Sequence, residues 1–426
     1  MPAETIFALS SGAPPAGIAV VRVSGPAAGD ALHILAGGLP EPRKAAARTL
    51  RDADGSELDR ALVLWLPGPG TATGEDVAEL HLHGGRAVVA AVERALGDAP
   101  GLRAATPGEF TRRAFANGRI DLAEAEGLAD LLTAETELQR RSAMALAGGA
   151  LSRKADIWRD AVLALSAEVE AVLDFSDEED AADLPQSFVA RAGALAGDLH
   201  AWLERPRATI LREGYRIVLA GPPNAGKSSL FNALLESEAA ITSPTAGTTR
   251  DVLERSVAMA GIPFTFVDTA GLREGESDEI ETIGIARAGE QIARADLVLW
   301  LGEEGAGPPG AWEIDPKADD PARRAKSTEA LPLSARTGFH VELLRERLID
   351  HARRAMPAPG EVALTERQSS LLEEARHALA GIGEQADPLL AAEHLRLARN
   401  AFDRLVGRAS TDHMLDALFG RFCIGK

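Results

Sequence analysis

The chain has one cysteine, and it has no long apolar run. It contains 426 residues, of which 46% are hydrophobic, and its only thiol belongs to Cys423. A single thiol excludes an internal disulfide framework and a cysteine-cluster zinc site, and it fits a reducing compartment. The apolar runs are all far shorter than the roughly 20 residues that a membrane span requires. We therefore expect no membrane-spanning segment.

Positive charge is also scarce. The chain has 45 Lys and Arg residues against 64 Asp and Glu residues, which gives a formal net charge of −19. Nonspecific coating of nucleic acid needs dense positive charge, so the net charge argues against that class of function. An RNA partner would need a local patch or a second protein. The N-terminal stretch MPAETIFALSSGAPPAG has no basic region followed by an apolar one, as a secretion signal would. A cytoplasmic location is expected.

The texture of the sequence changes along the chain and predicts a multidomain α/β plus α protein. Residues 1–118 mix strand-like runs such as AGIAVVRVSG with one helical run, which predicts an α+β domain. Residues 119–212 have helical spacing of apolar side chains. Residues 213–352 alternate buried-strand runs with helices, which is typical of a parallel sheet covered by helices. Helical texture returns over 353–426, so the α/β unit is inserted into a helical domain.

The inserted unit begins with a phosphate-binding motif. The strand-like YRIVLA is followed by the loop Gly221-Pro-Pro-Asn-Ala-Gly226-Lys227-Ser228, which fits GxxxxGKS, and then by the helical SLFNALLES. Strand, loop and helix stand in the order that this motif requires. The glycines let backbone N–H groups face the phosphates, Lys227 reaches the β and γ oxygens, and the Ser228 hydroxyl binds Mg²⁺. The sequence therefore predicts a nucleoside triphosphate site.

A DxxG element and a threonine-rich loop follow at the distances expected of a GTPase. In Asp268-Thr-Ala-Gly271, the carboxylate holds Mg²⁺ through water and the glycine amide senses the γ-phosphate. The intervening SPTAGTTRD supplies Thr248 and Thr249, one of which completes the Mg²⁺ shell. A loop of this kind orders and disorders with the nucleotide in GTPase switches. The alternative is a surface turn that is rich in threonine.

The base-selecting element departs from the usual Asn-Lys-x-Asp. Here it is Pro316-Lys317-Ala318-Asp319, and proline lacks both the amide side chain and the backbone donor. We therefore expect a weaker preference for guanine. Ser334-Ala335-Arg336 follows the strand-like ALPL and matches the loop that backs the guanine ring, so GTP stays favoured over ATP.

The position after the DxxG glycine also departs from many small GTPases. It holds Leu272, which cannot polarise water as a glutamine would. Hydrolysis then needs another group, together with a cation that neutralises the charge on the transferred phosphoryl. The following acidic stretch offers the candidate carboxylates Glu274, Glu276, Asp278, Glu279 and Glu281.

Eight ordered stretches across the whole chain resemble the tRNA-modification GTPase family that acts on the wobble uridine, often called TrmE or MnmE. They are GIAVVRVSG, TGEDVAELHLHGG, PGEFTRRAFANGRIDLAEAEGLADL, GPPNAGKSSLFNALL, AGTTRD, DTAGLRE, DEIETIGI and FCIGK. The resemblance implies a homodimer with an N-terminal domain that binds 5-formyl- or 5,10-methylene-tetrahydrofolate, a helical bundle and an inserted Ras-like G domain. It also implies a GTPase that K⁺ activates. With a flavin (FAD)-dependent partner, it adds a carboxymethylaminomethyl or aminomethyl group to carbon 5 of the wobble uridine of tRNA, using the folate one-carbon unit.

The resemblance implies roles for individual residues as well. The GTP contacts are Asn224, Ala225, Gly226, Lys227, Ser228, Ser229, Ser243, Pro244, Thr245, Ala246, Gly247, Thr248, Thr249, Asp268, Thr269, Ala270, Gly271, Lys317, Asp319, Ser334, Ala335 and Arg336. Mg²⁺ is assigned to Ser228 and Thr249, and K⁺ to Asn224, Ser243, Thr245 and Thr248. The catalytic carboxylate is Glu281, and the folate contacts are Arg22, Glu79, Arg119 and Lys426.

The tail FCIGK has two interpretations. Cys423 is either a small packed hydrophobe or a nucleophile or redox contact near the one-carbon chemistry. Gly425 would let the tail bend so that Lys426 reaches the folate.

His81 and His83 alternate along a strand and face the same side of it, as a pair of metal ligands would. Zinc needs three or four ligands, so surface or hydrogen-bonded histidines are expected.

Two other functions stay open. A translation or ribosome-assembly GTPase switch would lack the folate-type N-terminal domain. A noncatalytic scaffold would have lost turnover together with the Asn-Lys-x-Asp element, but the intact Lys227, Ser228, Asp268 and Glu281 argue against it.

Overall fold

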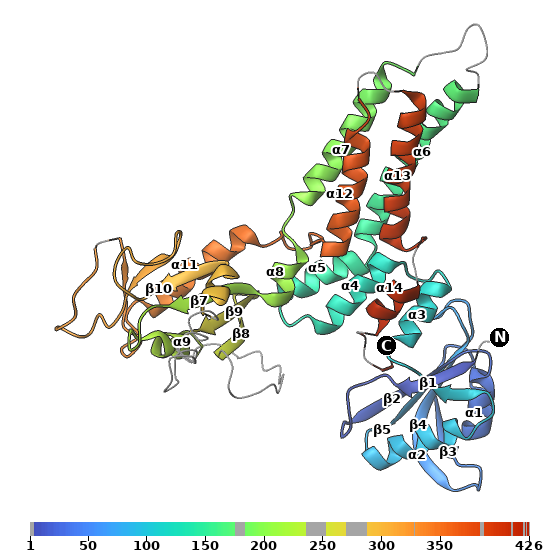
Figure 1. Ribbon diagram of the computed structural model, residues 1–426. Helices are drawn as coiled ribbons and strands as arrows, with labels where there is room; N and C mark the ends of the chain where they lie inside the picture. The colour runs from blue at the N-terminus through green and yellow to red at the C-terminus, as the bar shows by residue number, and fades with distance from the viewer. Residues whose placement is uncertain are drawn as a thin grey trace, which may run out of the picture. The chain divides into compact units, whose positions relative to one another are not determined.

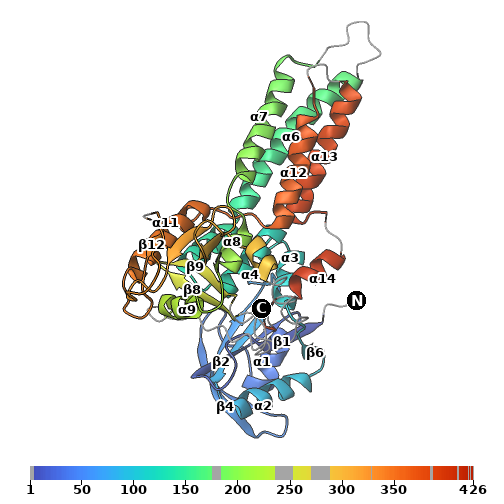
Figure 2. The ribbon, with the colours of Figure 1, turned by 60° about the vertical axis from the view of Figure 1, so that its left-hand side comes forward.

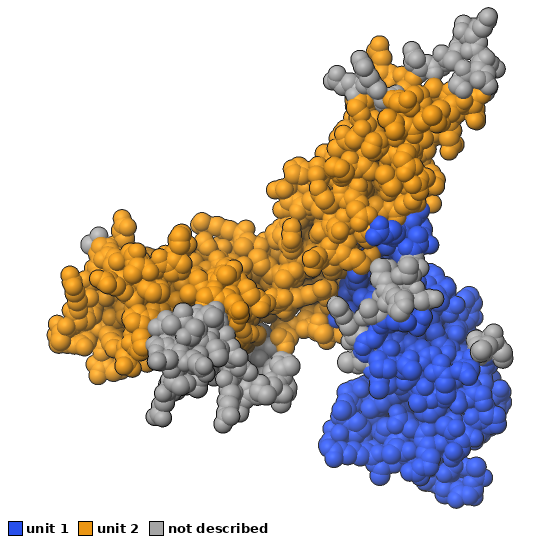
Figure 3. Space-filling model, in the orientation of Figure 1, with its two compact units in different colours: residues 1–129, 403–426 blue, residues 130–402 orange. Residues whose placement is uncertain are grey.

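The computed structural model describes residues 4–174, 184–235, 253–269, 288–327, 329–383, 387–409, 412–420, 422 and 424–425. The chain divides into two compact units (Figure 3). The first unit comprises residues 1–129 and 403–426, and the second comprises residues 130–402. Within the described ranges, no helix combines the length and the apolar character that crossing a bilayer would require.

The first unit is built on a sheet of six described strands in the order β3-β4-β5-β2-β1-β6 (Figure 1). Neighbouring strands are antiparallel, except that β6 runs parallel to β1. The strands are β1 Thr5–Leu9, β2 Ile18–Ser24, β3 Ala46–Arg51, β4 Glu57–Leu66, β5 Val77–His83 and β6 Leu102–Ala104. The helices are α1 Ala28–Ala36, α2 Arg86–Gly97, α3 Glu109–Ala116, α14 Asp412–Phe419 and α4 Leu122–Thr133, which begins in this unit.

The two faces of this sheet differ because its strands alternate apolar and polar residues. Along β2 and β5 fully buried side chains alternate with partly exposed ones, as expected when one face packs on a core. Val21 and Leu80 point into the core that α1 and α2 cover. Arg22 and Glu79, which are paired across β2 and β5, lie on the other face with His81. Two predicted folate contacts are thus neighbours on the face that α1 and α2 leave uncovered.

The C-terminal segment packs closely against the rest of the first unit at two glycines. A Cβ atom on Gly108, just before α3, would lie 2.1 Å from the carbonyl oxygen of Phe419 at the end of α14. A Cβ atom on Gly425 would lie 2.1 Å from the carbonyl oxygen of Leu9, and this glycine has φ of +91°. Neither position tolerates a side chain without a shift of backbone. Gly425 therefore lies against the end of β1.

The second unit contains a sheet of six described strands in the order β12-β11-β10-β7-β9-β8. β8 is antiparallel to β9, and the other pairs are parallel. The strands are β7 Tyr215–Ala220, β8 Leu253–Met259, β9 Ile262–Asp268, β10 Leu297–Trp300, β11 Trp312–Asp315 and β12 Leu331–Pro332. Every residue of β9 is buried, as expected of a parallel strand covered on both faces.

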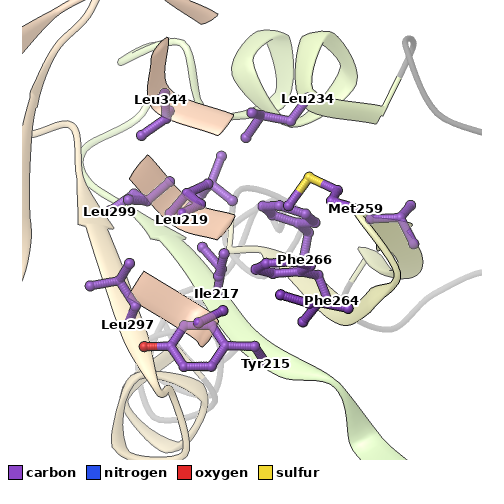
Figure 4. Close-up of a cluster of buried hydrophobic side chains, with 14 of the residues drawn as sticks. Tyr215, Ile217, Leu219, Leu234, Met259, Phe264, Phe266, Leu297, Leu299 and Leu344 are labelled. Carbon is purple, nitrogen blue, oxygen red and sulfur yellow. The ribbon is translucent and has the colours of Figure 1, made fainter. Parts of the chain in front are cut away.

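The core of this α/β part gathers around β7 and β9. Figure 4 shows Tyr215 of β7 beside Phe264 and Phe266 of β9. The helices α9 Lys227–Leu235 and α11 Val341–Ala355 contribute Leu234 and Leu344 to the same cluster. This packing fixes the carboxyl ends of β7 and β9, where the phosphate-binding motif lies.

Four long helices of the second unit form a bundle, and they lie side by side in both ribbon views (Figures 1 and 2). They are α6 Ala150–Asp174, α7 Ser187–Leu203, α12 Glu366–Ala380 and α13 Pro388–Val406. The ring of Trp158 lies 5.4 Å from that of Trp202 and 5.8 Å from that of Phe402, which joins three of these helices. Two of the four precede the sheet and two follow it. The predicted fold class, an α/β unit inserted into a helical bundle, is confirmed.

Two shorter helices connect the bundle to the sheet. They are α5 Glu137–Ala147 and α8 Ala208–Glu213. Thr136 and Gln139 form a reciprocal capping box at the start of α5, and the Gln139 amide also donates to the carbonyl of Leu211 in α8. The backbone N–H of Leu138 donates to the carbonyl of Gly261 in the β8–β9 turn. The base of the bundle is thereby hydrogen-bonded to the sheet.

Candidate functional site

The phosphate-binding motif lies where the sequence predicts, between the end of β7 and the start of α9. Gly221 and Gly226 have φ of +148° and +97°, and Asn224 between them has φ of 60°. Lys227 is the first residue of α9 and is 5% exposed. Its ammonium group donates to the carbonyl oxygens of Gly221 at 3.0 Å and Pro222 at 2.8 Å. The lysine charge is held inside the loop, where it can meet phosphate oxygens.

Ser228 and Asp268 meet at the edge of the sheet beside this loop. The Ser228 hydroxyl donates to Asp268 Oδ2 at 2.6 Å, and the aspartate is fully buried at the end of β9. The next residue, Thr269, donates from its hydroxyl to the carbonyl of Leu219 at 2.9 Å, which ties the end of β9 to β7. Hydroxyl and carboxylate oxygens are ligands that suit Mg²⁺. The pair therefore fits the predicted metal role.

A cavity of about 480 Å³ opens next to the loop and is lined by the predicted base-binding residues. Its walls include Gly226, Ser229, Pro316, Lys317, Asp319, Ser334, Ala335 and Arg336. The Lys317 ammonium donates to the carbonyl of Asn224 at 2.7 Å and so links the base-selecting element to the phosphate loop. Sequence segments from three parts of the chain therefore converge on one cavity.

The carboxylate of Asp319 has two side-chain donors in this cavity. Ser334 donates from its hydroxyl to Oδ1 at 2.5 Å, and Arg336 donates from Nε to Oδ2 at 2.7 Å. The hydrogen bond from Ser334, together with the bond and charge of Arg336, lowers the pKa of Asp319 below its ordinary value. Asp319 is thus held ionised, as gripping two N–H groups of a base requires.

Several predicted site residues lie outside the described residues. They are Ser243, Pro244, Thr245, Ala246, Gly247, Thr248, Thr249, Ala270, Gly271, Glu281, Cys423 and Lys426. Leu272 and the rest of its acidic stretch lie outside them as well. The structure therefore brings together the phosphate loop, Asp268, Thr269 and the base-binding residues, and the roles of the other residues stay predictions.

Arg22 and Glu79 form an ion pair on the face of the first sheet opposite α1 and α2. Arg22 Nη2 lies 2.9 Å from Glu79 Oε1, and the Arg22 guanidinium carbon lies 6.0 Å from the centre of the Phe110 ring. His81 Nε2 is 3.2 Å from the other oxygen of Glu79. Burial raises the pKa of Glu79, but the charge and hydrogen bonds of Arg22, with those of His81, outweigh it and leave the pKa below its ordinary value.

The two histidines of β5 each have a carboxylate partner. His81 is hydrogen-bonded to Glu79, and His83 Nδ1 lies 2.7 Å from Asp59 Oδ1. Within the described ranges, no group of three or more His, Cys, Asp or Glu side chains is placed to hold a metal ion. The histidines are hydrogen-bonded, in agreement with the interpretation favoured from sequence.

Arg119 lies at the loop between β4 and β5, because a Cβ atom on Gly74 would be 3.2 Å from its side chain. A polar network that sequence reasoning missed holds this loop. The Ser24 hydroxyl is 2.7 Å from that of Thr73 and donates to Glu75, which also accepts from Arg113. Thr73 and Glu75 belong to TGEDVAELHLHGG, one of the stretches that carry the family resemblance, and that is the signal that could have indicated them.

Comparison with known proteins gives full-length matches. The family model "MnmE helical domain" matches residues 122–423, and the model "GTP-binding protein TrmE N-terminus" matches residues 5–119. The tRNA modification GTPases MnmE of Novosphingobium aromaticivorans and Erythrobacter litoralis are 63% and 64% identical to this chain. Each alignment covers 99% of this chain and 100% of the relative.

A solved structure of Era from Aquifex aeolicus, bound to GDP·AlF₄⁻, also matches part of the chain. It is 22% identical over 38% of this chain and 66% of its own, with a TM-score of 0.24. A likeness this weak carries no argument about fold or function.

Proposed function

The chain belongs to the MnmE family of tRNA modification GTPases, and from this premise we propose that it is a K⁺-activated GTPase that drives a folate-dependent modification of the wobble uridine. GTP hydrolysis and a role in tRNA modification follow from the family. The activation by K⁺, the FAD-dependent partner, the one-carbon donor, the homodimer and the cytoplasmic location are parts of the proposal. The division of the chain into domains at residues 1–118, 119–212, 213–352 and 353–426 also belongs to the proposal.

The observation that carries the hydrolytic half is the contact of Ser228 with Asp268 beside the buried Lys227. Ser228 and Thr249 would hold Mg²⁺, with Asp268 acting on its water shell, and the ion would neutralise charge on the phosphates. Lys227 would bind the β- and γ-phosphate oxygens from inside the loop. Asp319 would select the base.

A second cation would replace the arginine that many GTPases receive from a partner. Asn224 supports this role by its position in the phosphate loop, where an amide oxygen is a suitable ligand for a hard cation. We propose that Ser243, Thr245 and Thr248 complete the K⁺ site and that Glu281 orients the attacking water.

The folate half is supported by the first unit. Arg22 and Glu79 form a charged pair beside an aromatic ring, and a pterin offers both a hydrogen-bonding edge and a flat face. Arg119 is exposed and can meet the glutamate carboxylates of folate. The close approach of Gly425 to Leu9 supports a role for Lys426 at the same sheet.

The alternative of a ribosome-assembly switch loses its support in the N-terminal region. Such a protein would lack a folate-type domain, whereas residues 5–119 match the TrmE N-terminal family model.

The test is reconstitution of the modification. Full-length protein, the FAD-dependent enzyme of a close relative, tRNA, GTP and 5,10-methylene-tetrahydrofolate would be combined with an amine, which is ammonium for the aminomethyl product and glycine for the carboxymethylaminomethyl product. Nucleosides would be analysed by mass spectrometry. We expect a modified uridine at the wobble position that disappears when GTP or the folate is omitted. A product that forms equally without folate would overturn the one-carbon part of the proposal. The variant Lys227→Ala controls for nucleotide use.

A further inference from the structure

The base-binding cavity lacks the residue that usually braces it. In an Asn-Lys-x-Asp element, the asparagine amide can cross-link the surrounding loops by hydrogen bonds, but Pro316 has neither an amide side chain nor a backbone N–H. Pro316 and Gly226 both line the cavity, and a Cβ atom built on Gly226 would lie 3.9 Å from the proline Cβ. The proline ring has no donor with which to orient a carboxylate.

Asp319 needs such orientation because it must present both oxygens to one base. A guanine offers N1–H and the N2 amino group side by side, and each N–H must meet a carboxylate oxygen at hydrogen-bonding distance. An ionised carboxylate has about four lone-pair sites. Two hydrogen bonds from neighbouring residues can therefore fix it while two sites remain for the base.

Arg336 supplies a donor of this kind. Its Nε lies 2.7 Å and its Nη2 2.5 Å from Asp319 Oδ2, while Ser334 occupies Oδ1. The side chain of Asp319 is 17% exposed and that of Arg336 is 80% exposed, so the arginine approaches the carboxylate from the solvent side. Both oxygens are thus held, each by a different residue of the loop after β12.

We propose that Arg336 is a positioning residue for guanine selection: its guanidinium fixes the carboxylate of Asp319 and compensates for the bracing that Pro316 cannot provide. The inference rests on the proposed role of Asp319 in the GTP site. It predicts that Arg336 affects affinity and base choice, and that it has little effect on phosphate chemistry, since it acts only through Asp319.

The first experiment measures binding of GDP and IDP to full-length protein by calorimetry. Hypoxanthine lacks the N2 amino group, so IDP can make only one of the two contacts with Asp319. We expect Arg336→Ala to weaken GDP binding about three- to fivefold, as for other exposed ion pairs. The affinity for IDP should fall by a smaller factor, so the ratio of GDP affinity to IDP affinity should decrease. Arg336→Lys should restore part of it, because lysine keeps the charge without the planar fork.

The matched control is Arg347→Ala, which removes an exposed arginine of α11 that is not part of the cavity wall. It should leave both affinities unchanged. In steady-state hydrolysis, Arg336→Ala should raise KM and leave kcat within about twofold, because among the described residues its hydrogen bond and ion pair are with the base-selecting carboxylate. The thermal unfolding midpoint of each variant shows whether the fold is retained.

The second experiment separates positioning from direct contact with the nucleotide. Asp319→Asn offers an amide donor that suits the C2 carbonyl of xanthine, so XDP is the probe in that background. If Arg336 acts through the charge of Asp319, adding Arg336→Ala to Asp319→Asn should leave XDP affinity unchanged. A loss of equal size in both backgrounds, or unchanged or tighter GDP binding by Arg336→Ala, would overturn the inference. Failure of the unsubstituted protein to bind GDP would instead refute the GTP site itself.

Discussion

The Ser228 hydroxyl donates a 2.6 Å hydrogen bond to Asp268 Oδ2, which joins the first turn of α9 to the last residue of β9. The two residues are 40 positions apart in the chain. They meet because β7 and β9 are parallel neighbours whose carboxyl ends share one edge of the sheet. The same edge carries Lys227, so the polar groups that a magnesium nucleotide needs are brought together by the strand order.

The aspartate at this edge predicts a metal dependence. Asp268→Asn should raise the Mg²⁺ concentration for half-maximal GTP hydrolysis about 10- to 100-fold, as for loss of a partner that orients a metal shell. Titration of hydrolysis with Mg²⁺ measures it. Asp350→Asn, on the exposed face of α11, is the matched control. An unchanged Mg²⁺ requirement would remove Asp268 from the metal site.

The acidic stretch after the DxxG element contains our proposed catalytic carboxylate. Glu281→Ala should keep GTP affinity and lose turnover, because a group that orients water acts only in the chemical step. Single-turnover hydrolysis together with nucleotide binding separates the two effects. Glu346→Ala, which removes an exposed glutamate of α11, serves as the control. Full turnover by Glu281→Ala would assign the role to another carboxylate of that stretch.

The close approach of Gly425 to Leu9 provides a test of the folate site. Gly425→Ala should weaken binding of 5-formyl-tetrahydrofolate at least tenfold, because the added methyl group would meet the Leu9 carbonyl and displace the tail. Gly55→Ala is the control, since Gly55 has a similar φ of +85° and open space around it. Calorimetry with both variants measures the difference. Equal affinities would mean that the tail does not contribute to the folate site.

We expect Glu109 to stabilise the first unit in a way that acid removes. Burial raises its pKa, but hydrogen bonds from Arg103, Thr106 and Arg113 lower it to about 2. Because the pKa of Glu109 is lower in the folded than in the unfolded protein, its charge stabilises the fold at pH values above 4.5, the ordinary pKa of glutamate. This stabilisation is lost as the pH falls through about 2.

The matching variant is Glu109→Gln, which removes the charge. Its unfolding midpoint should lie below that of the unsubstituted protein at pH 7, and the gap should narrow as the pH falls from about 4.5 towards 2. Glu57→Gln, in an exposed pair with Arg51, should have a smaller effect at pH 7. Differential scanning fluorimetry across this pH range measures both. A gap that stays constant with pH would contradict the role of the Glu109 charge.

The sequence alone predicted the parts of the fold that carry strong local signals. The strands β7 and β9 are continuous apolar runs, and the phosphate loop needs glycines at positive φ. These patterns can be recognised in the sequence without knowledge of tertiary contacts. β8 was missed. Its sequence LERSVAM mixes charged and apolar residues because it is an antiparallel strand at the sheet edge.

The candidate site was predictable only where a motif fixes it. Lys227, Ser228 and Asp268 stand in short patterns whose chemistry is local. The pairing of Arg336 with Asp319 spans 17 residues, and the polar network that joins Ser24 to Thr73 spans 49. Such contacts depend on which loops lie close together in the folded protein, and the periodicity of the sequence does not predict which loops these are.

We propose that K⁺ takes the place of the arginine that many GTPases receive from a partner. The most direct measurement is steady-state GTP hydrolysis by full-length protein in potassium buffer and in sodium buffer at the same ionic strength, with saturating Mg²⁺. We predict slow hydrolysis in sodium and an increase of at least tenfold in potassium, because the cation neutralises charge on the transferred phosphoryl group. Equal rates in the two buffers would contradict the claim.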